Sequence, residues 1–149
     1  MAKSVAAILH ATDFSTASRP AFARALEWAR RDRAELVLVH VLSPPAITLE
    51  DSYLSEKTYR DLEAAALRDA RKRLGALAAR AKGAGVRASS LAVSGIPDEE
   101  ILRAARRQRA ALIVLGTHGR TGFARAMLGS VAERVASLAR CPVLTVRGT

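Results

Sequence analysis

The chain contains the stretch Leu36-Val37-Leu38-Val39-His40-Val41-Leu42. Its residues are apolar almost without interruption, which is typical of a strand that is covered on both faces. Strands of this kind belong to parallel sheets with helices on both sides, whereas a half-exposed strand alternates apolar and polar residues. The run therefore predicts an α/β fold with an interior strand at residues 36–42.

Short apolar runs alternate with helical patterns on either side of this strand. Further strands are expected at residues 5–10, 88–93, 111–115 and 143–146. Helices are expected after an N-cap at Ser15 or Ser18 with Pro20 in the first turn, over residues 57–82, from Pro97, and over residues 130–139. The order βαβαβαβαβ requires right-handed crossovers, so the sheet should be parallel and open, with helices on both faces and one Rossmann-like domain over residues 1–149.

Two helices carry more specific expectations. The long helix at 57–82 is expected to carry an apolar face made of Tyr59, Leu62, Ala66, Ala70, Leu74, Leu77 and Ala81. Gly83 and Gly85 should end it. In the helix at 130–139, Ser130 and Glu133 have the spacing of a capping box, which predicts Ser130 as the N-cap.

Composition limits the class of protein. Half of the 149 residues are apolar and only 4% are aromatic, so the core should be aliphatic. No apolar stretch approaches the roughly 20 residues of a membrane span, and the first residues do not resemble a secretory signal. The single cysteine, Cys141, has no partner for an internal disulfide, and it is interpreted as a packed thiol rather than a redox sensor. These features predict a cytoplasmic protein.

The net charge of +10 is unevenly distributed. Residues 57–149 hold eighteen of the 24 Lys and Arg residues but seven of the 14 Asp and Glu residues. Much of this excess falls on expected helices, where solvated side chains account for it. Nucleic-acid binding is not favoured as the main function, because aromatic residues for base stacking are scarce and no nucleic-acid-binding motif is present. Attraction of anionic small molecules or of an acidic partner stays open.

Three loops are expected at the carboxyl ends of the strands, where open α/β sheets bind ligands: residues 11–15, 43–56 and 116–130. The third contains Gly116, Gly119 and Gly129-Ser130, with Arg120 and Arg125 between them. Glycines allow positive φ and close approach of backbone N–H groups to an anion, and a helix N-terminus attracts phosphate. The loop therefore predicts a phosphate site. The chain has neither a Walker A motif nor a G-x-G-x-x-G fingerprint after the first strand, which argues against a P-loop NTPase and a dinucleotide dehydrogenase. The role of residues 43–56 is not evident.

The spacing Gly116-x2-Gly119-x9-Gly129-Ser130 resembles the signature of the ATP-binding branch of the universal stress proteins. Residues 8–15, Ile-Leu-His-Ala-Thr-Asp-Phe-Ser, and residues 141–146, Cys-Pro-Val-Leu-Thr-Val, are also similar to that family. The resemblance spans essentially the whole chain. Ala11 is a departure, since many members carry proline there, but it removes no polar ligand.

The resemblance implies a five-stranded sheet in the order 3-2-1-4-5 and an ATP site with Mg²⁺ or Mn²⁺. Adenine would bind the backbone of Val41, Asp13 would lie near the ribose or a metal-bound water, and the glycine loop with Ser130 would hold the phosphates. The full set of implied nucleotide contacts is Ala11, Thr12, Asp13, Val41, Leu115, Gly116, His118, Gly119, Arg120, Gly129, Ser130 and Val131. A homodimer is implied through the last strand, Val143, Leu144, Thr145 and Val146, which is an edge that needs cover.

Several residues have a second interpretation. Asp13 could only form an Asx-turn before the first helix, and Ser130 could only cap a helix. His10, His40 and His118 all fall at or just after strand ends and could form a transition-metal site, although they lack metal-ligand spacing. Strand-end histidines also commonly bond backbone groups.

The leading functional hypothesis is a nucleotide-dependent stress-response protein that binds ATP without strong catalysis, because no general base, lysine or water-positioning glutamine accompanies the loop. The alternatives are a slow ATP hydrolase or another ATP-using enzyme, a binder of AMP or cyclic AMP, and a binder of an acidic partner through the basic surface.

Overall fold

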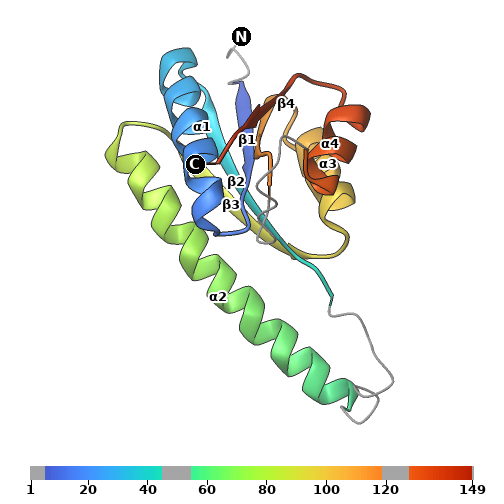
Figure 1. Ribbon diagram of the computed structural model, residues 1–149. Helices are drawn as coiled ribbons and strands as arrows, with labels where there is room; N and C mark the ends of the chain where they lie inside the picture. Colours follow the sequence, from blue (N-terminus) through green and yellow to red (C-terminus); the bar gives the residue numbers. More distant parts are fainter. Residues whose placement is uncertain (1–5, 45–54, 119–127, 149) are drawn as a thin grey trace.

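The structure is a computed structural model that describes residues 6–44, 55–118 and 128–148. These residues form a parallel five-stranded sheet in the order β3-β2-β1-β4-β5 (Figure 1). The strands are β1 (Ala7–Ala11), β2 (Glu35–Leu42), β3 (Ala88–Ser94), β4 (Ala110–Gly116) and β5 (Val143–Val146). The fold class and the strand order agree with the expectations from the pattern and from the family resemblance.

Helices cover both faces of the sheet. The helical elements are η1 (Thr16–Ser18), α1 (Arg19–Asp32), α2 (Glu56–Gly83), α3 (Pro97–Arg107) and α4 (Ser130–Leu138). Figure 1 shows α1 and α2 on one side of the sheet and α3 and α4 on the other. Consecutive crossovers of one hand place α1 and α2 together, and the chain then returns to the far side of β1 and builds β4 and β5.

The core consists of two aliphatic layers separated by the sheet. Because side chains alternate along a strand, Leu36 and Leu38 of β2 pack toward α1 and α2, whereas Val37 and Val39 pack toward α3 and α4. All four are at most 2% exposed. The nearly continuous apolar run at residues 36–42 is therefore explained by burial on both faces.

Helix α2 is buried over only part of its length. Its N-cap, Ser55, accepts a hydrogen bond from the backbone N–H of Thr58, and its buried residues begin only at Ala70. Leu62 is 57% exposed, so the apolar face does not cover the sheet along its whole length. The periodicity continues through the first turns, but those turns extend past the end of the sheet (Figure 1). Gly85, with φ of 81°, follows the end of the helix.

The start of α4 is also different from the prediction. Gly129, not Ser130, is the N-cap, since the backbone N–H of Glu133 donates to the Gly129 carbonyl at 2.9 Å. Ser130 is the first residue of the helix, so the expected capping box does not form. At α1 the N-cap is Ser18, one of the two predicted residues, although its side chain does not bond the helix.

None of the helices in the described ranges combines the length and the apolar character that a membrane span requires.

Candidate functional site

Three strand ends meet where the strand order reverses. From β1 the chain builds β2 and β3 on one side and β4 and β5 on the other, so β1 and β4 flank the switch point of the sheet. Ala11 ends β1 opposite Val39, and His10 lies opposite Val114. The predicted positions Ala11, Val41 and Leu115 thus lie at the carboxyl ends of three adjacent strands.

The turn after β1 is held by its own polar groups. Thr12 is buried; its backbone N–H donates to Val39 O at 2.9 Å, and its Oγ1 accepts from the Phe14 N–H at 3.0 Å. Asp13 Oδ1 accepts from the Ser15 N–H at 2.9 Å, which is the Asx-turn of its second interpretation. Asp13 is half-buried, so its side chain is still partly accessible from outside the turn.

Phe14 and His40 form a contact that the sequence did not predict. Phe14 adopts a φ of 62°, an uncommon conformation for a bulky residue. Its ring stacks on His40 with the centroids 4.5 Å apart, and His40 Nδ1 lies 2.8 Å from the Thr12 carbonyl oxygen, to which it donates. Through this stack and this hydrogen bond, His40 of β2 holds the turn that follows β1. No motif marks the stack, because it depends on a backbone conformation that aromatic residues rarely adopt.

The two ends of the β4–α4 connection close on each other. Gly116 ends β4, the Thr117 N–H donates to Val146 O at 3.0 Å, and the Gly129 N–H donates to Thr117 O at 2.6 Å. A Cβ on Gly129 would lie 2.9 Å from Thr117 O, closer than real Cβ atoms approach. Glycine is therefore required at 129 by this backbone contact. As a consequence, the N-terminus of α4 lies beside Thr117 and His118.

Positive φ does not explain the glycine at 116. Its φ is not positive, and a Cβ there would meet Ala17 O at 3.6 Å, an ordinary contact. Gly119 and Arg120, the other predicted contacts in the loop, lie outside the described residues, as does Arg125.

The first residues of α4 present groups that suit an anion. Helix N-termini leave their first backbone N–H groups without intrahelical partners, and the helix dipole adds positive potential there. Because Gly129 provides the cap, the exposed Ser130 side chain is not used for capping. Val131 follows it, half-buried against the α3–α4 core layer.

The three histidines each use Nδ1 within the fold. His10 Nδ1 lies 3.0 Å from Val114 O, His40 Nδ1 binds Thr12 O, and His118 Nδ1 lies 2.9 Å from Thr117 Oγ1. Burial lowers the pKa of His10 from 6.5 to about 4, so its ring is neutral at physiological pH. No cluster of His, Cys, Asp and Glu suited to a metal occurs within residues 6–44, 55–118 and 128–148.

Cys141 lies half-buried against the α3–α4 core layer. Burial raises the pKa of its thiol, which reduces the thiolate fraction. This environment agrees with a packed thiol.

Comparison with known proteins adds an independent line of evidence. The family model described as the universal stress protein family matches residues 5–147. Universal stress protein YxiE of Bacillus subtilis is 33% identical over 144 residues, covering 94% of this chain and 97% of its own.

Solved structures agree with this result. The structure of MJ0577, a universal stress protein of Methanocaldococcus jannaschii, superimposes with a TM-score of 0.84 at 26% identity and covers 97% of this chain and 96% of its own. A universal stress protein solved in complex with cAMP has a TM-score of 0.65 at 27% identity, covering 97% of this chain and 98% of its own. By its sequence over nearly its full length, and by the fold just described, the chain belongs to the universal stress protein family.

Proposed function

We propose that this protein binds ATP at the carboxyl ends of β1, β2 and β4, and that nucleotide occupancy regulates a stress response. The observation that carries the proposal is the closure of Gly129 onto Thr117, which sets the free N-terminus of α4 and the Ser130 hydroxyl beside the carboxyl end of β4. Backbone N–H groups and a helix dipole at that position favour a phosphate group.

The remaining contacts follow from the position of each residue at the site. The Val41 backbone at the end of β2 would receive adenine, Asp13 would lie at the ribose or at the shell of a Mg²⁺ or Mn²⁺ ion, and Gly116 with His118 would border the phosphates. Gly119 and Arg120 complete the proposed phosphate loop. The β1 turn supports this arrangement, because Asp13 accepts a hydrogen bond from the Ser15 N–H and Thr12 accepts one from the Phe14 N–H.

Strong catalysis is not part of the proposal. Among the described residues, Asp13 is the acidic side chain placed at the proposed site, and phosphoryl transfer requires a positioned base or water-orienting group together with metal ions. We therefore expect binding with slow hydrolysis at most. A cytoplasmic location, expected from the sequence, is also part of the proposal.

A second ligand is favoured by one observation. A relative with 27% identity over nearly the whole chain was solved with cAMP, so a cyclic monophosphate is an alternative occupant of the same site. The N-terminus of α4 accommodates one phosphate as readily as the last phosphate of a chain of three.

Isothermal titration with ATP, ADP, AMP and cAMP, with and without Mg²⁺, distinguishes these ligands. We expect ATP to bind best and Gly129→Asp to weaken it at least about tenfold, since a carboxylate would occupy the anion site and clash with Thr117. Gly75→Asp, on an open surface of α2, is the matched control and should bind ATP normally. If folded Gly129→Asp protein binds ATP as tightly as wild type, the site is wrongly placed.

A further inference from the structure

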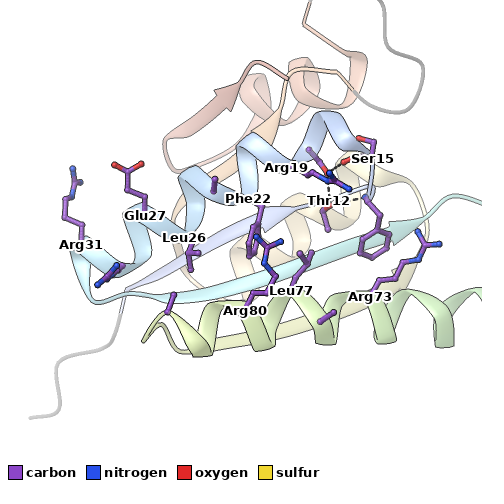
Figure 2. A pocket seen from close by; sticks show the side chains of 16 residues that line it. Thr12, Ser15, Arg19, Phe22, Leu26, Glu27, Arg31, Arg73, Leu77 and Arg80 are labelled. Carbon is purple, nitrogen blue, oxygen red and sulfur yellow. Dashed lines mark hydrogen bonds between the residues drawn. The ribbon is translucent and has the colours of Figure 1, made fainter. Parts of the chain in front are cut away.

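A groove runs between α1 and α2, on the sheet face opposite α3 and α4 (Figure 2). Its volume is about 960 Å³. Thr12 and Ser15 line one end of it, and Ala84 lies at the end of α2. Neither Gly129 nor Ser130 lines it, so the groove is distinct from the phosphate-binding part of the proposed nucleotide site.

The middle of the groove is apolar. Phe22 is buried, and Leu26 of α1 and Leu77 of α2 are half-buried against the same core layer. Figure 2 shows these three side chains between the two helices. Ala23 and Ala76, both exposed, leave the space above them open. An apolar surface of this kind gains free energy when a partner covers it.

Both walls of the groove are basic. Five of the lining residues are arginines, three from α1 and two from α2: Arg19, Arg30, Arg31, Arg73 and Arg80. The acidic lining residue is Glu27, and Arg24 already neutralises it through an ion pair of 3.0 Å. The groove therefore carries a strong excess of positive charge next to its apolar floor.

Some of these arginines are committed within the protein and others are available. Arg31 pairs with Asp32 at 2.9 Å and Arg73 with Asp69 at 3.1 Å. Within the described parts of the chain, Arg19, Arg30 and Arg80 have no carboxylate partner. The Arg80 guanidinium lies 5.2 Å from the Phe22 ring centroid, so an available charge borders the apolar floor itself.

The spacing of the charges selects the shape of the occupant. Arg19 and Arg30 are eleven residues apart on α1, which corresponds to about 16 Å along a helix. Arg80 adds a charge on the opposite wall. A single headgroup or phosphate would contact only one of these positions, whereas a segment with carboxylates on both flanks would contact all three.

We propose that the groove binds an acidic amphipathic helix of about three turns, supplied by a partner protein. Its apolar stripe would lie on Phe22, Leu26 and Leu77, and its flanking carboxylates would pair with Arg19, Arg30 and Arg80. Helix-in-groove recognition uses apolar anchors at positions i, i+3, i+4 and i+7, which match a floor between two helices. A second copy of this face is disfavoured, because it would bring arginines against arginines.

The probe is a fluorescent peptide of about 12 residues with leucines at positions i, i+3, i+4, i+7 and i+8 and glutamates on both flanks. A scrambled peptide of the same composition, which spreads the leucines around the helix, is the control. Fluorescence anisotropy should give micromolar affinity for the ordered peptide and at least about tenfold weaker binding for the scrambled one. Equal binding of the two peptides would overturn the proposal, since net charge alone would then explain it.

Protein variants locate the binding. Arg30→Glu with Arg80→Glu should weaken the ordered peptide at least about tenfold, whereas Arg71→Glu with Arg107→Glu makes the same charge change outside the groove and should have little more than the general electrostatic effect, about twofold. Ala76→Trp should block the groove, whereas Ala79→Trp, an exposed alanine of α2 outside the groove, should not. Equal losses in the two members of either pair would contradict the assignment.

Other occupants give different results in the same experiment. Lysophosphatidate below its micellar concentration should not compete with the peptide, and the Ala76→Trp variant should keep the oligomeric state of the wild-type protein. Competition by the lipid, or dissociation of a dimer by Ala76→Trp, would replace the proposal with a lipid site or a contact between copies. ATP titration of the groove variants should be unchanged, which separates this proposal from the nucleotide site.

Discussion

At the scale of single residues, Gly129 and Gly116 differ in why they are glycine. A methyl group at 129 would lie 2.9 Å from a backbone oxygen that cannot move without opening the β4–α4 closure, whereas one at 116 would make an ordinary contact at 3.6 Å. We expect Gly129→Ala to lower the free energy of unfolding by about 1–3 kcal/mol, the usual cost of overpacking, and Gly116→Ala to change it by less than about 0.5 kcal/mol. Urea unfolding of the two variants is the measurement. Equal losses of unfolding free energy in the two variants would show that the backbone at Gly129 and Thr117 can shift to relieve the contact.

His10 makes stability depend on pH. Its pKa is about 4 in the folded protein, against 6.5 for an ordinary histidine, because burial disfavours the charged ring. Between these values the unfolded chain binds a proton that the folded chain does not, so stability is lost as pH falls from 6.5 toward 4. The full difference is about 3 kcal/mol.

Denaturant unfolding of wild type and His10→Asn at pH 7 and pH 4 tests this, and the wild-type protein should lose about 3 kcal/mol more than the variant. An NMR titration of the His10 ring supplies a direct check. A midpoint near 6.5 in the folded protein would contradict the burial argument.

At the scale of elements, an ion pair connects α3 and α4, which cover the same face of the sheet. Asp98, in the first turn of α3, pairs with Arg134 of α4 at 2.8 Å, and the Asp98 side chain is only 8% exposed. Removing Arg134 would leave a nearly buried carboxylate without its partner. This pair therefore fixes α4, and with it Ser130, relative to α3.

A double-mutant cycle measures the strength of that connection. We expect a coupling free energy of about 1–2 kcal/mol for Asp98→Ala and Arg134→Ala, reduced from a fully buried pair because Arg134 is 62% exposed. The same cycle on Glu56 and Arg60, 89% and 76% exposed, should give less than about 0.5 kcal/mol. A coupling as small at Asp98 would mean that packing alone orients α4.

The sequence predicted the elements well where the signal is local. The β2 run reports burial on both faces through its composition alone, and Pro97 with three following carboxylates marked the start of α3 correctly. The pattern did not show that Leu62 is exposed, because a helical repeat does not reveal where the sheet beneath it ends. It failed at Ser130 because the cap is chosen by the contact between Gly129 and Thr117, residues that are distant along the chain. The strand order itself came from family resemblance.

At the scale of the whole molecule, β5 is an edge strand whose four residues, Val143, Leu144, Thr145 and Val146, are all partly accessible. An uncovered edge presents unpaired backbone groups that favour pairing with another chain. We therefore expect a homodimer through β5. Thr145→Lys should convert it to a monomer in sedimentation velocity, because a charge on each copy would meet at the interface.

Ser90→Lys is the matched control, since Ser90 is an exposed residue of β3 at the opposite edge of the sheet. It should leave the dimer intact. Loss of the dimer in Ser90→Lys alone would assign the interface to the other edge, and a wild-type monomer would remove the proposal.

The central place of β1 has a consequence for protein synthesis. Its neighbour β4 is made about a hundred residues later, as the hydrogen bond between His10 and Val114 across 104 positions illustrates. The proposed nucleotide pocket takes its first wall from the β1 turn and its last from α4, so a ribosome must release the chain through α4 before a ligand can bind. Nucleotide binding would thus stabilise against proteolysis only chains that have been synthesised through α4, while shorter products would stay unprotected.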